Sequence, residues 1–156
     1  MNYIIDANNL AGKLDLLGEE NFDKKLIEMM RNYFLNKKIK VYLVFDSADL
    51  MGDKFQEENI FVVYTPRDKY YKSADDKIVE LVKKYLEDSK EEITVVTDDI
   101  ELKDKVKKIS EKTNKVFLQQ ATAFAEKLKL DIYKEDDGLS EDEKDEINDE
   151  LLNIWK

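Results

Sequence analysis

Short runs of apolar, β-forming residues recur along the chain and are separated by longer, mixed segments. Each run has about the length of a strand that is buried in a sheet, and polar or turn-forming residues bound it. The runs are Tyr3–Ile5, Val41–Phe45, Ile60–Tyr64, Ile93–Val96 and Val116–Leu118. The pattern therefore predicts about five strands.

The segments between these runs place apolar residues at helical spacing, three and four positions apart. In 22–36, for example, Leu26, Met30 and Phe34 fall on one face. The predicted helices are 22–36, 74–86, 100–109 and 121–128. Strands that alternate with helices favour parallel pairing through βαβ units. We therefore expect a three-layer α/β/α domain with a mostly parallel sheet.

The last residues differ in composition from the rest of the chain. The stretch "LSEDEKDEINDELLNIWK" begins with a capping box at Ser140 and Glu143, and apolar residues then recur every four positions to Trp155. We divide the chain into a globular domain, 1–134, and an acidic segment, 135–156, that contains an amphipathic helix. The apolar stripe of this helix either docks on the globular domain or serves a second role, capturing a partner or shielding the active site.

Composition removes several classes of chemistry. The 156 residues include no Cys and no His, which excludes ordinary zinc sites, thiol nucleophiles and imidazole bases. No apolar stretch reaches the roughly 18 residues of a membrane span, and the N-terminus has no signal-like segment. We expect a cytoplasmic protein without a membrane partner, whose chemistry depends on carboxylates, hydroxyls, Lys and Arg.

The net charge of −10 is unevenly distributed. Residues 135–156 contain ten acids and two Lys, so the globular part is close to neutral. A polyanionic partner is therefore compatible with residues 1–134. Bases are frequent in one run from Lys103 to Lys115, which is also the ordinary composition of a solvated helix face.

Acidic residues end three of the predicted strands. Asp6 follows the first, Asp46 the second, and Asp98 and Asp99 the fourth, while the pair Asp75 and Asp76 begins a helix. Each has a structural explanation as a helix cap or turn residue. Because parallel strands end at one edge, however, we expect Asp6, Asp46, Asp75 and Asp99 to line one pocket. Carboxylates gathered without His or Cys suit Mg²⁺ or Mn²⁺.

Two Asn follow the first of these acids. Asn8 and Asn9 each offer an amide to a metal, to a phosphate or to a neighbouring carboxylate, and the sequence leaves their roles open. Asn also tolerates the left-handed backbone that a turn after a strand often needs.

The segment "TPRDKYYKSADDK" is the best candidate for binding a substrate with phosphates and unpaired bases. Basic side chains supply phosphate contacts, and Tyr rings supply stacking faces. The Tyr pair has packing as its alternative role. The candidates are Arg67, Lys69, Tyr70, Tyr71, Lys72 and Lys77.

Four motifs, in this order and at these spacings, resemble the NYN domain. They are "IIDANNL", "VYLVFDSAD", "KSADDKIVELV" and "ITVVTDDIELKDKV". More narrowly, they are similar to the YacP-like branch, whose members are PIN-like ribonucleases. The resemblance covers about residues 1–130.

Individual positions match the family's motifs. Asp6 and Asn9 match the Asp and Asn of a motif that reads approximately Asp-Gly-Tyr-Asn, with Ala7 in place of Gly and Asn8 at the aromatic position. Asp46 matches the Asp of the family's Phe-Asp pair at the end of the second strand. The remaining matches are Ser73, Ala74, Asp75 and Asp76 in a Thr/Ser-Ala-Asp element and Thr97, Asp98 and Asp99 in a Thr-Ser-Asp element.

The resemblance implies an endoribonuclease that depends on Mg²⁺ or Mn²⁺ and cleaves single-stranded RNA. Relatives act on messenger RNA, some in association with the ribosome. The implied catalytic acids are Asp6, Asp46, Asp75 and Asp99; the implied metal ligands are Asp6, Asp75 and Asp99, with Asp76 and Asp98 as further candidates; the supporting residues are Asn8, Asn9, Ser73 and Thr97. The alternative is a degenerate member that binds RNA or a ribosomal partner without cutting.

Overall fold

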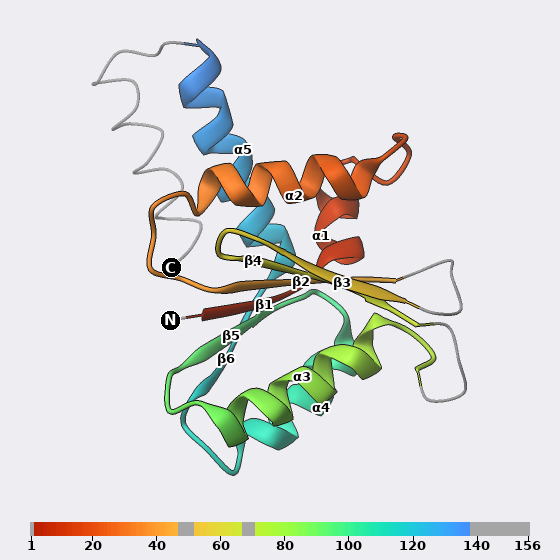
Figure 1. Ribbon diagram of the computed structural model, residues 1–156, viewed down its shortest axis with the longest axis vertical. Coiled ribbons are helices and arrows are strands. Elements are labelled where there is room, and N and C mark those ends of the chain that lie inside the picture. The colour runs from red at the N-terminus through yellow and green to blue at the C-terminus, as the bar shows by residue number, and fades with distance from the viewer. Residues whose placement is uncertain (1, 47–51, 67–70, 138–156) are drawn as a thin grey trace.

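Six strands form one sheet in the order β3-β4-β2-β1-β5-β6 (Figure 1). The computed structural model describes residues 2–46, 52–66 and 71–137. The strands are β1 (Asn2–Asp6), β2 (Val41–Asp46), β3 (Asp53–Glu57), β4 (Ile60–Thr65), β5 (Ile93–Val96) and β6 (Val116–Gln119). All neighbours pair in parallel except β3 and β4, which are antiparallel.

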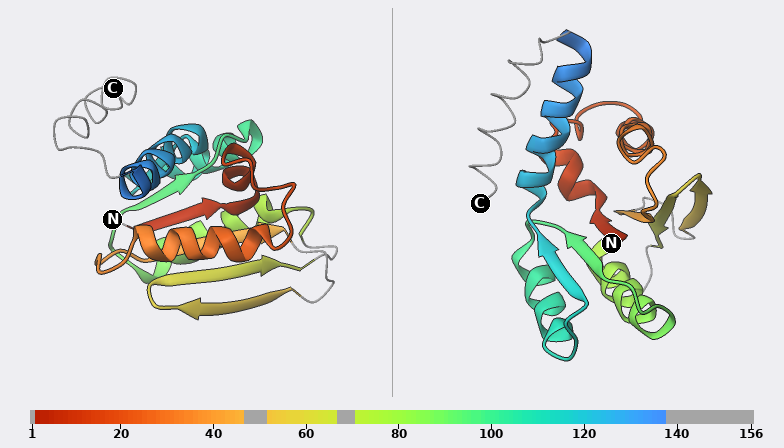
Figure 2. Two further views of the ribbon diagram at one scale, coloured as in Figure 1. Left: turned by 90° about the horizontal axis from the view of Figure 1, so that it is seen from above. Right: turned by 90° about the vertical axis from the view of Figure 1, so that its left-hand side faces the viewer.

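Helices cover both faces of this sheet, as Figure 2 shows. One face carries α1 (Ala7–Lys13), α2 (Phe22–Tyr33) and α5 (Ala121–Asp137); the other carries α3 (Ala74–Asp88) and α4 (Ile100–Ser110). The expected three-layer α/β/α fold with a mostly parallel sheet is confirmed. None of the described helices has the length and apolarity that crossing a membrane requires.

Each face of the sheet has its own hydrophobic core. Leu26, Phe34 and Phe124 belong to the core under α1, α2 and α5, and Ile78 and Leu102 to the core under α3 and α4. Strand β1 contributes to both, because side chains alternate along a strand. Its residues are buried on both faces, so β1 lies at the centre of the molecule.

The prediction of about five strands missed β3. Its sequence, DKFQE, has neither an apolar run nor a buried face, and four of its five residues are exposed. It forms because its backbone pairs with β4, from Asp53 opposite Tyr64 to Glu57 opposite Ile60. Charged residues on such an edge also discourage pairing with another chain.

Two further elements differ from their prediction. Asn8 and Asn9 lie within α1, and the left-handed non-glycine residues among those described are Asp15, Asn21, Asn36 and Glu58. The chain after β1 therefore continues as a helix and does not use the tolerance of Asn for left-handed backbone; burial of Leu10 and Ala11 favours this helix. Helix α5 continues past the predicted boundary at 134, and the C-terminal helix expected in 135–156 lies outside the described residues from 138 onward.

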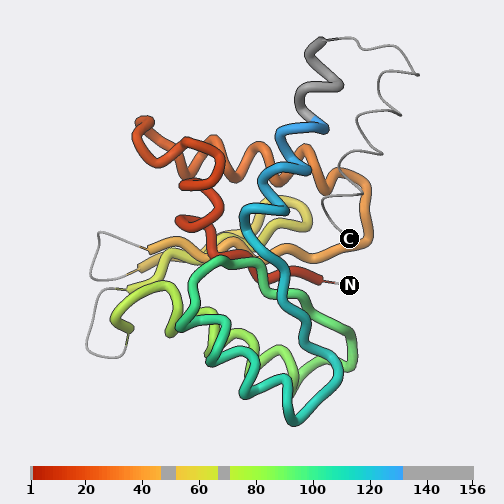
Figure 3. The backbone as a smooth tube through the Cα atoms, turned by 180° about the vertical axis from the view of Figure 1, so that it is seen from behind, coloured from red at the N-terminus to blue at the C-terminus, as the bar shows by residue number. Residues whose placement is uncertain are grey.

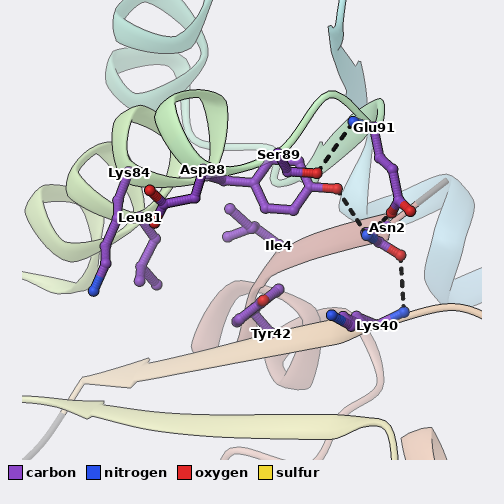
Figure 4. A pocket seen from close by; sticks show the side chains of 10 residues that line it. Asn2, Ile4, Lys40, Tyr42, Leu81, Lys84, Asp88, Ser89 and Glu91 are labelled. Atoms are coloured by element: carbon purple, nitrogen blue, oxygen red, sulfur yellow. Dashed lines mark hydrogen bonds between the residues drawn. The ribbon is translucent and has the colours of Figure 1, made fainter.

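The amino ends of the strands are held together by a buried side chain. Asn2, which is 3% exposed, donates from Nδ2 to the Tyr85 hydroxyl (2.7 Å) and to Glu91 (2.8 Å), and its Oδ1 accepts the Lys40 N–H (2.9 Å) (Figure 4). These bonds join β1 to the start of β2 and to the end of α3. A cavity of about 380 Å³ opens beside them.

Candidate active site

A pocket of about 560 Å³ lies at the opposite edge, where the strands end. Four chain segments that are distant in sequence reach this edge, and the backbone trace in Figure 3 can be followed there. Asp6 ends β1, Asp46 ends β2, Asp75 is in the first turn of α3, and Asp99 is the N-cap residue of α4. All four line the pocket, so the structure brings these predicted acids to one edge of the sheet.

Asp6 is the most deeply buried of these acids, with 6% of its surface exposed. Burial raises its pKa from 3.8 to about 7; the hydrogen bond from Thr97 opposes this shift, and the charges of Asp75 and Asp46 add to it. Asp6 is therefore a carboxyl that titrates near neutral pH, which is the range of a useful proton acceptor.

Thr97 connects two of the pocket acids. Its buried hydroxyl donates to Asp6 Oδ2 (3.1 Å) and accepts the backbone N–H of Asp99 (3.1 Å). Asp99 Oδ1 in turn accepts the Leu102 N–H (2.9 Å) and caps α4. The support role predicted for Thr97 thus has a geometric basis, because one hydroxyl orients both segments.

Asn8 and Asn9 hold the strand ends on either side of β1. Asn8 Oδ1 accepts the backbone N–H of Asp46 (3.0 Å), and Asn9 Oδ1 accepts that of Asp98 (2.9 Å). The donors are backbone N–H groups, so the accepting atom of each amide must be its carbonyl oxygen. The two Asn therefore fix β2 and β5 to the first turn of α1, while both residues also line the pocket.

The start of α3 carries the fourth acid into the pocket. Ser73 caps the helix by accepting the Asp75 N–H (3.2 Å), and Asp46 Oδ1 accepts the Ala74 N–H (2.6 Å). The pKa of Asp75 is raised to about 6 by burial, then by repulsion from Asp99; Lys105 partly offsets these effects. Such repulsion indicates that nearby basic side chains compensate the negative charge of these carboxylates only in part.

Asp98 does not belong to this group, although the sequence made it a candidate ligand. Its Oδ1 accepts the Ala121 N–H (3.0 Å), and its Oδ2 accepts the Thr122 N–H (3.0 Å) and the Thr122 hydroxyl. Burial disfavours its ionised form, but these bonds and Lys13 outweigh burial and lower its pKa. Asp98 is a helix cap of α5, since helix N-termini attract carboxylates.

Asp76 also points away from the pocket. Its Oδ2 accepts the Lys72 N–H (2.8 Å), and its Oδ1 pairs with Lys105 (3.8 Å). It lines a different groove, between α3 and α4. Adjacent helical positions differ in direction by about 100°, so Asp75 and Asp76 cannot both face the pocket.

The predicted substrate loop is only partly described. Arg67, Lys69 and Tyr70 lie outside the described residues. Tyr71 donates its hydroxyl to Glu80, and the Lys77 ammonium lies 5.2 Å from the Tyr71 ring centroid. Tyr71, which precedes α3, thus contacts Lys77 of α3, and this contact supports the packing interpretation of this Tyr. Lys72 is exposed.

The pocket also contains residues that sequence reasoning did not select. Gly12, Lys13 and Leu17 line it, and Lys13 lies 3.8 Å from Asp98. Asn9 and Lys13 are four residues apart on α1, so both face the same edge. That spacing was the available signal, but it required knowing that α1 is a helix.

The described acids surround the pocket without converging on one point. Among residues 2–46, 52–66 and 71–137, no three acidic side chains lie close enough together to form a ready-made metal site. Mg²⁺ usually keeps several waters and takes one or two carboxylates together with substrate phosphates. The donor set, all hard oxygens, therefore fits a hydrated Mg²⁺ or Mn²⁺ ion.

The α/β/α layers and the mostly parallel sheet, with acids at its carboxyl edge, are those of a PIN-like fold. The sequence matches the model of the YacP-like NYN domain over residues 3–156, and the chain belongs to this family. The match confirms the resemblance and extends it beyond residue 130.

A known crystal structure has the same fold. The crystal structure of Rae1 (YacP) from Bacillus subtilis superposes with a TM-score of 0.57 at 19% identity, covering 99% of this chain and 92% of that one. No curated protein matched the sequence.

Proposed function

We propose that this protein is an endoribonuclease that cleaves single-stranded RNA, with messenger RNA as its substrate class, and that depends on Mg²⁺ or Mn²⁺. The observation that carries the proposal is the meeting of four acids from four chain segments in one pocket. Membership of the YacP-like NYN family supports the same activity, because NYN domains are generally nucleases.

The electrostatics of the pocket favour cation binding. Burial and mutual repulsion raise the pKa of Asp6 to about 7 and that of Asp75 to about 6. A cation beside these groups removes the repulsion and holds both in the ionised form. We assign Asp6, Asp75 and Asp99 as the residues that hold the ion, with Asp46 behind them.

A bound divalent ion supplies a nucleophilic water and neutralises charge that develops on the phosphate. The chain's own residues position the reactants. Thr97 orients Asp6, Ser73 orients the first turn of α3, and Asn8 and Asn9 hold the flanking strand ends. Lys13, on the pocket wall, is placed to contact a substrate phosphate.

A second function has one observation in its favour. Among the described residues, no three acids form a preassembled metal site. A degenerate member of the family that binds RNA without cutting it would also lack such a site. The two functions share RNA binding and differ in turnover, so a cleavage assay separates them.

The decisive variants are Asp75→Asn and Asp75→Ala. Both remove the charge that helps to hold the cation, so cleavage of a labelled single-stranded RNA with Mg²⁺ or Mn²⁺ should fall at least about 100-fold. The matched control is Asp104→Asn, which removes the same charge from an exposed position of α4 and should retain parental activity.

Metal binding is measured separately from turnover. Mn²⁺ should raise the melting temperature of the parent and of Asp104→Asn, and raise that of Asp75→Asn much less. Parental cleavage rates in both Asp75 variants would remove Asp75 from the mechanism. A parent without metal-dependent cleavage would leave RNA binding as the function.

A further inference from the structure

A groove of about 590 Å³ runs between α3 and α4, on the opposite face of the sheet from α1, α2 and α5. Four Lys line it: Lys83 from α3, and Lys105, Lys108 and Lys112 from α4 and the turn after it. Val79 and Ile109 supply its apolar floor, and Asp76 is the one acidic residue among the described residues that line it. We call this feature the lysine groove.

The Lys side chains gather there because of helical spacing. Lys105 and Lys108 are three residues apart on α4, so they face the same side, and Lys112 extends this row in the turn after the helix. All four Lys are exposed. Like charges at such spacing destabilise a helix by a few tenths of a kcal/mol per pair, so the row has a cost in the free protein.

Within the described residues, the positive charge of the groove is poorly compensated. Lys105 pairs with Asp76, whereas Lys83, Lys108 and Lys112 make no ion pair there. This concentration of uncompensated Lys occurs in residues 1–134, which are close to neutral although the whole chain has a net charge of −10. A local excess of positive charge on a nearly neutral domain favours a polyanionic ligand at that part of the surface.

The groove adjoins the acid pocket. Asp75 lines the pocket, its neighbour Asp76 lines the groove, and Lys105 pairs with Asp76 while its charge also acts on Asp75. An extended polyanion can therefore pass from the groove into the pocket without crossing an intervening element.

We propose that the lysine groove binds the sugar-phosphate backbone of the single-stranded RNA whose scissile bond enters the acid pocket. This inference rests on the proposed function and adds the path of the substrate. The described residues that line the groove are Lys, two aliphatic residues and Asp76, with no aromatic ring among them, so the groove reads phosphate charge and not base identity. Binding through it is accordingly independent of RNA sequence.

The test compares two triple variants of the full chain. Lys83→Gln, Lys108→Gln and Lys112→Gln together remove three groove charges. The control combines Lys24→Gln, Lys38→Gln and Lys90→Gln, three exposed Lys outside the groove, and gives the same net charge. Binding of a fluorescent single-stranded RNA is measured by anisotropy against salt concentration, in EDTA, so that no cleavage contributes.

The groove variant should bind about 10- to 100-fold more weakly near 0.1 M salt, and its salt slope should flatten by up to about 2, since each lost phosphate contact contributes about 0.7 for a single strand. The control should retain the parental affinity and slope. Equal behaviour of the two variants overturns the proposal, as does a parent that binds no RNA; in either case the groove serves another ligand, such as an acidic protein surface.

Failure of the two proposals is distinguishable. A parent that binds RNA through the groove but does not cleave with Mg²⁺ or Mn²⁺ supports the groove and contradicts the nuclease assignment. A parent that cleaves, with both triple variants binding like the parent, contradicts the groove alone. Melting curves of both variants confirm that they remain folded, as expected for exposed side chains.

Discussion

Replacing the buried Asp6 carboxylate by the neutral amide of Asn should stabilise the metal-free protein while removing a group that we assign to the active site. The pKa of Asp6 is raised by burial first, against the hydrogen bond from Thr97, and by the charges of Asp75 and Asp46. The folded state therefore holds the proton more tightly than the unfolded chain does.

The sign and the size of the effect follow from this difference. A raised carboxyl pKa gives stability that is fully present below about pH 4 and is lost as pH rises toward about 7. The shift from 3.8 to about 7 corresponds to at most roughly 4 kcal/mol at about 1.4 kcal/mol per pKa unit. Because the repulsion is shared with Asp75, we expect Asp6→Asn to be more stable by about 1–4 kcal/mol at about pH 8.

Urea unfolding in EDTA across this pH range measures the prediction. The parent should lose stability as pH rises, and the variant should show a flatter dependence whose remainder belongs to Asp75, since the pKa of Asp75 is also raised. Asn retains an oxygen that accepts the Thr97 hydroxyl, so the local geometry survives. RNA cleavage should fall, in the opposite direction to stability.

Asp98→Asn is the control at the same sheet edge. The pKa of Asp98 is lowered, so its ionised form stabilises the fold above about pH 4 and this contribution is lost in acid. The substitution should destabilise at neutral pH by about 1–2 kcal/mol, because the amide keeps one of the two accepting oxygens and leaves a donor of Ala121 or Thr122 without its acceptor. If Asp6→Asn is instead less stable than the parent at about pH 8, Asp6 is held as a favourable anion and our reasoning about the pocket is wrong.

Substitutions at Thr97 and Gly52 give two further predictions. Thr97→Val should destabilise the fold by about 1–3 kcal/mol, because it leaves the Asp99 N–H without its acceptor and Asp6 without its donor. The lost hydrogen bond should raise the pKa of Asp6 and so move the pH–activity profile to higher pH. Thr97→Ser keeps the hydroxyl and should have neither effect. Gly52→Ala should lower the unfolding free energy by about 1–3 kcal/mol, since Gly52 has φ 67° and an added Cβ would lie 2.7 Å from the Tyr64 carbonyl oxygen. Gly18 has open space around it, so Gly18→Ala should leave the stability unchanged. Similar melting temperatures of these two variants would contradict the strain argument.

The buried strands were predictable because burial on both faces leaves a continuous apolar run. β5 was predicted with the bounds that it has, and β1, β2, β4 and β6 to within one residue at either end. β3 gives no such signal, since its residues are mostly exposed and it is defined by backbone pairing with β4. Helix α1 was missed because its seven residues are too few for a helical period to be recognised beside the strand that precedes it.

The segments that meet at the pocket could be predicted from the sequence, but the directions of their side chains could not. Strand-ending acids meet at one edge in any parallel sheet, so Asp6, Asp46 and Asp99 could be grouped. Neighbouring acids differ in what they touch: Asp99 caps α4 and lines the pocket, whereas Asp98 caps α5. That distinction depends on where α5 begins, 22 residues after Asp99 in sequence, and no local pattern records it.

The central position of β1 has a consequence for synthesis of the chain. Its neighbour β5 is made about 90 residues later, at Ile93–Val96, and until then one edge of β1 has no partner. A nascent chain that has emerged only through β4 holds two of the four pocket acids, Asp6 and Asp46. The site therefore cannot assemble until the residues that include Asp99 have left the ribosome, so an incomplete chain carries no finished pocket and lacks the activity that we propose.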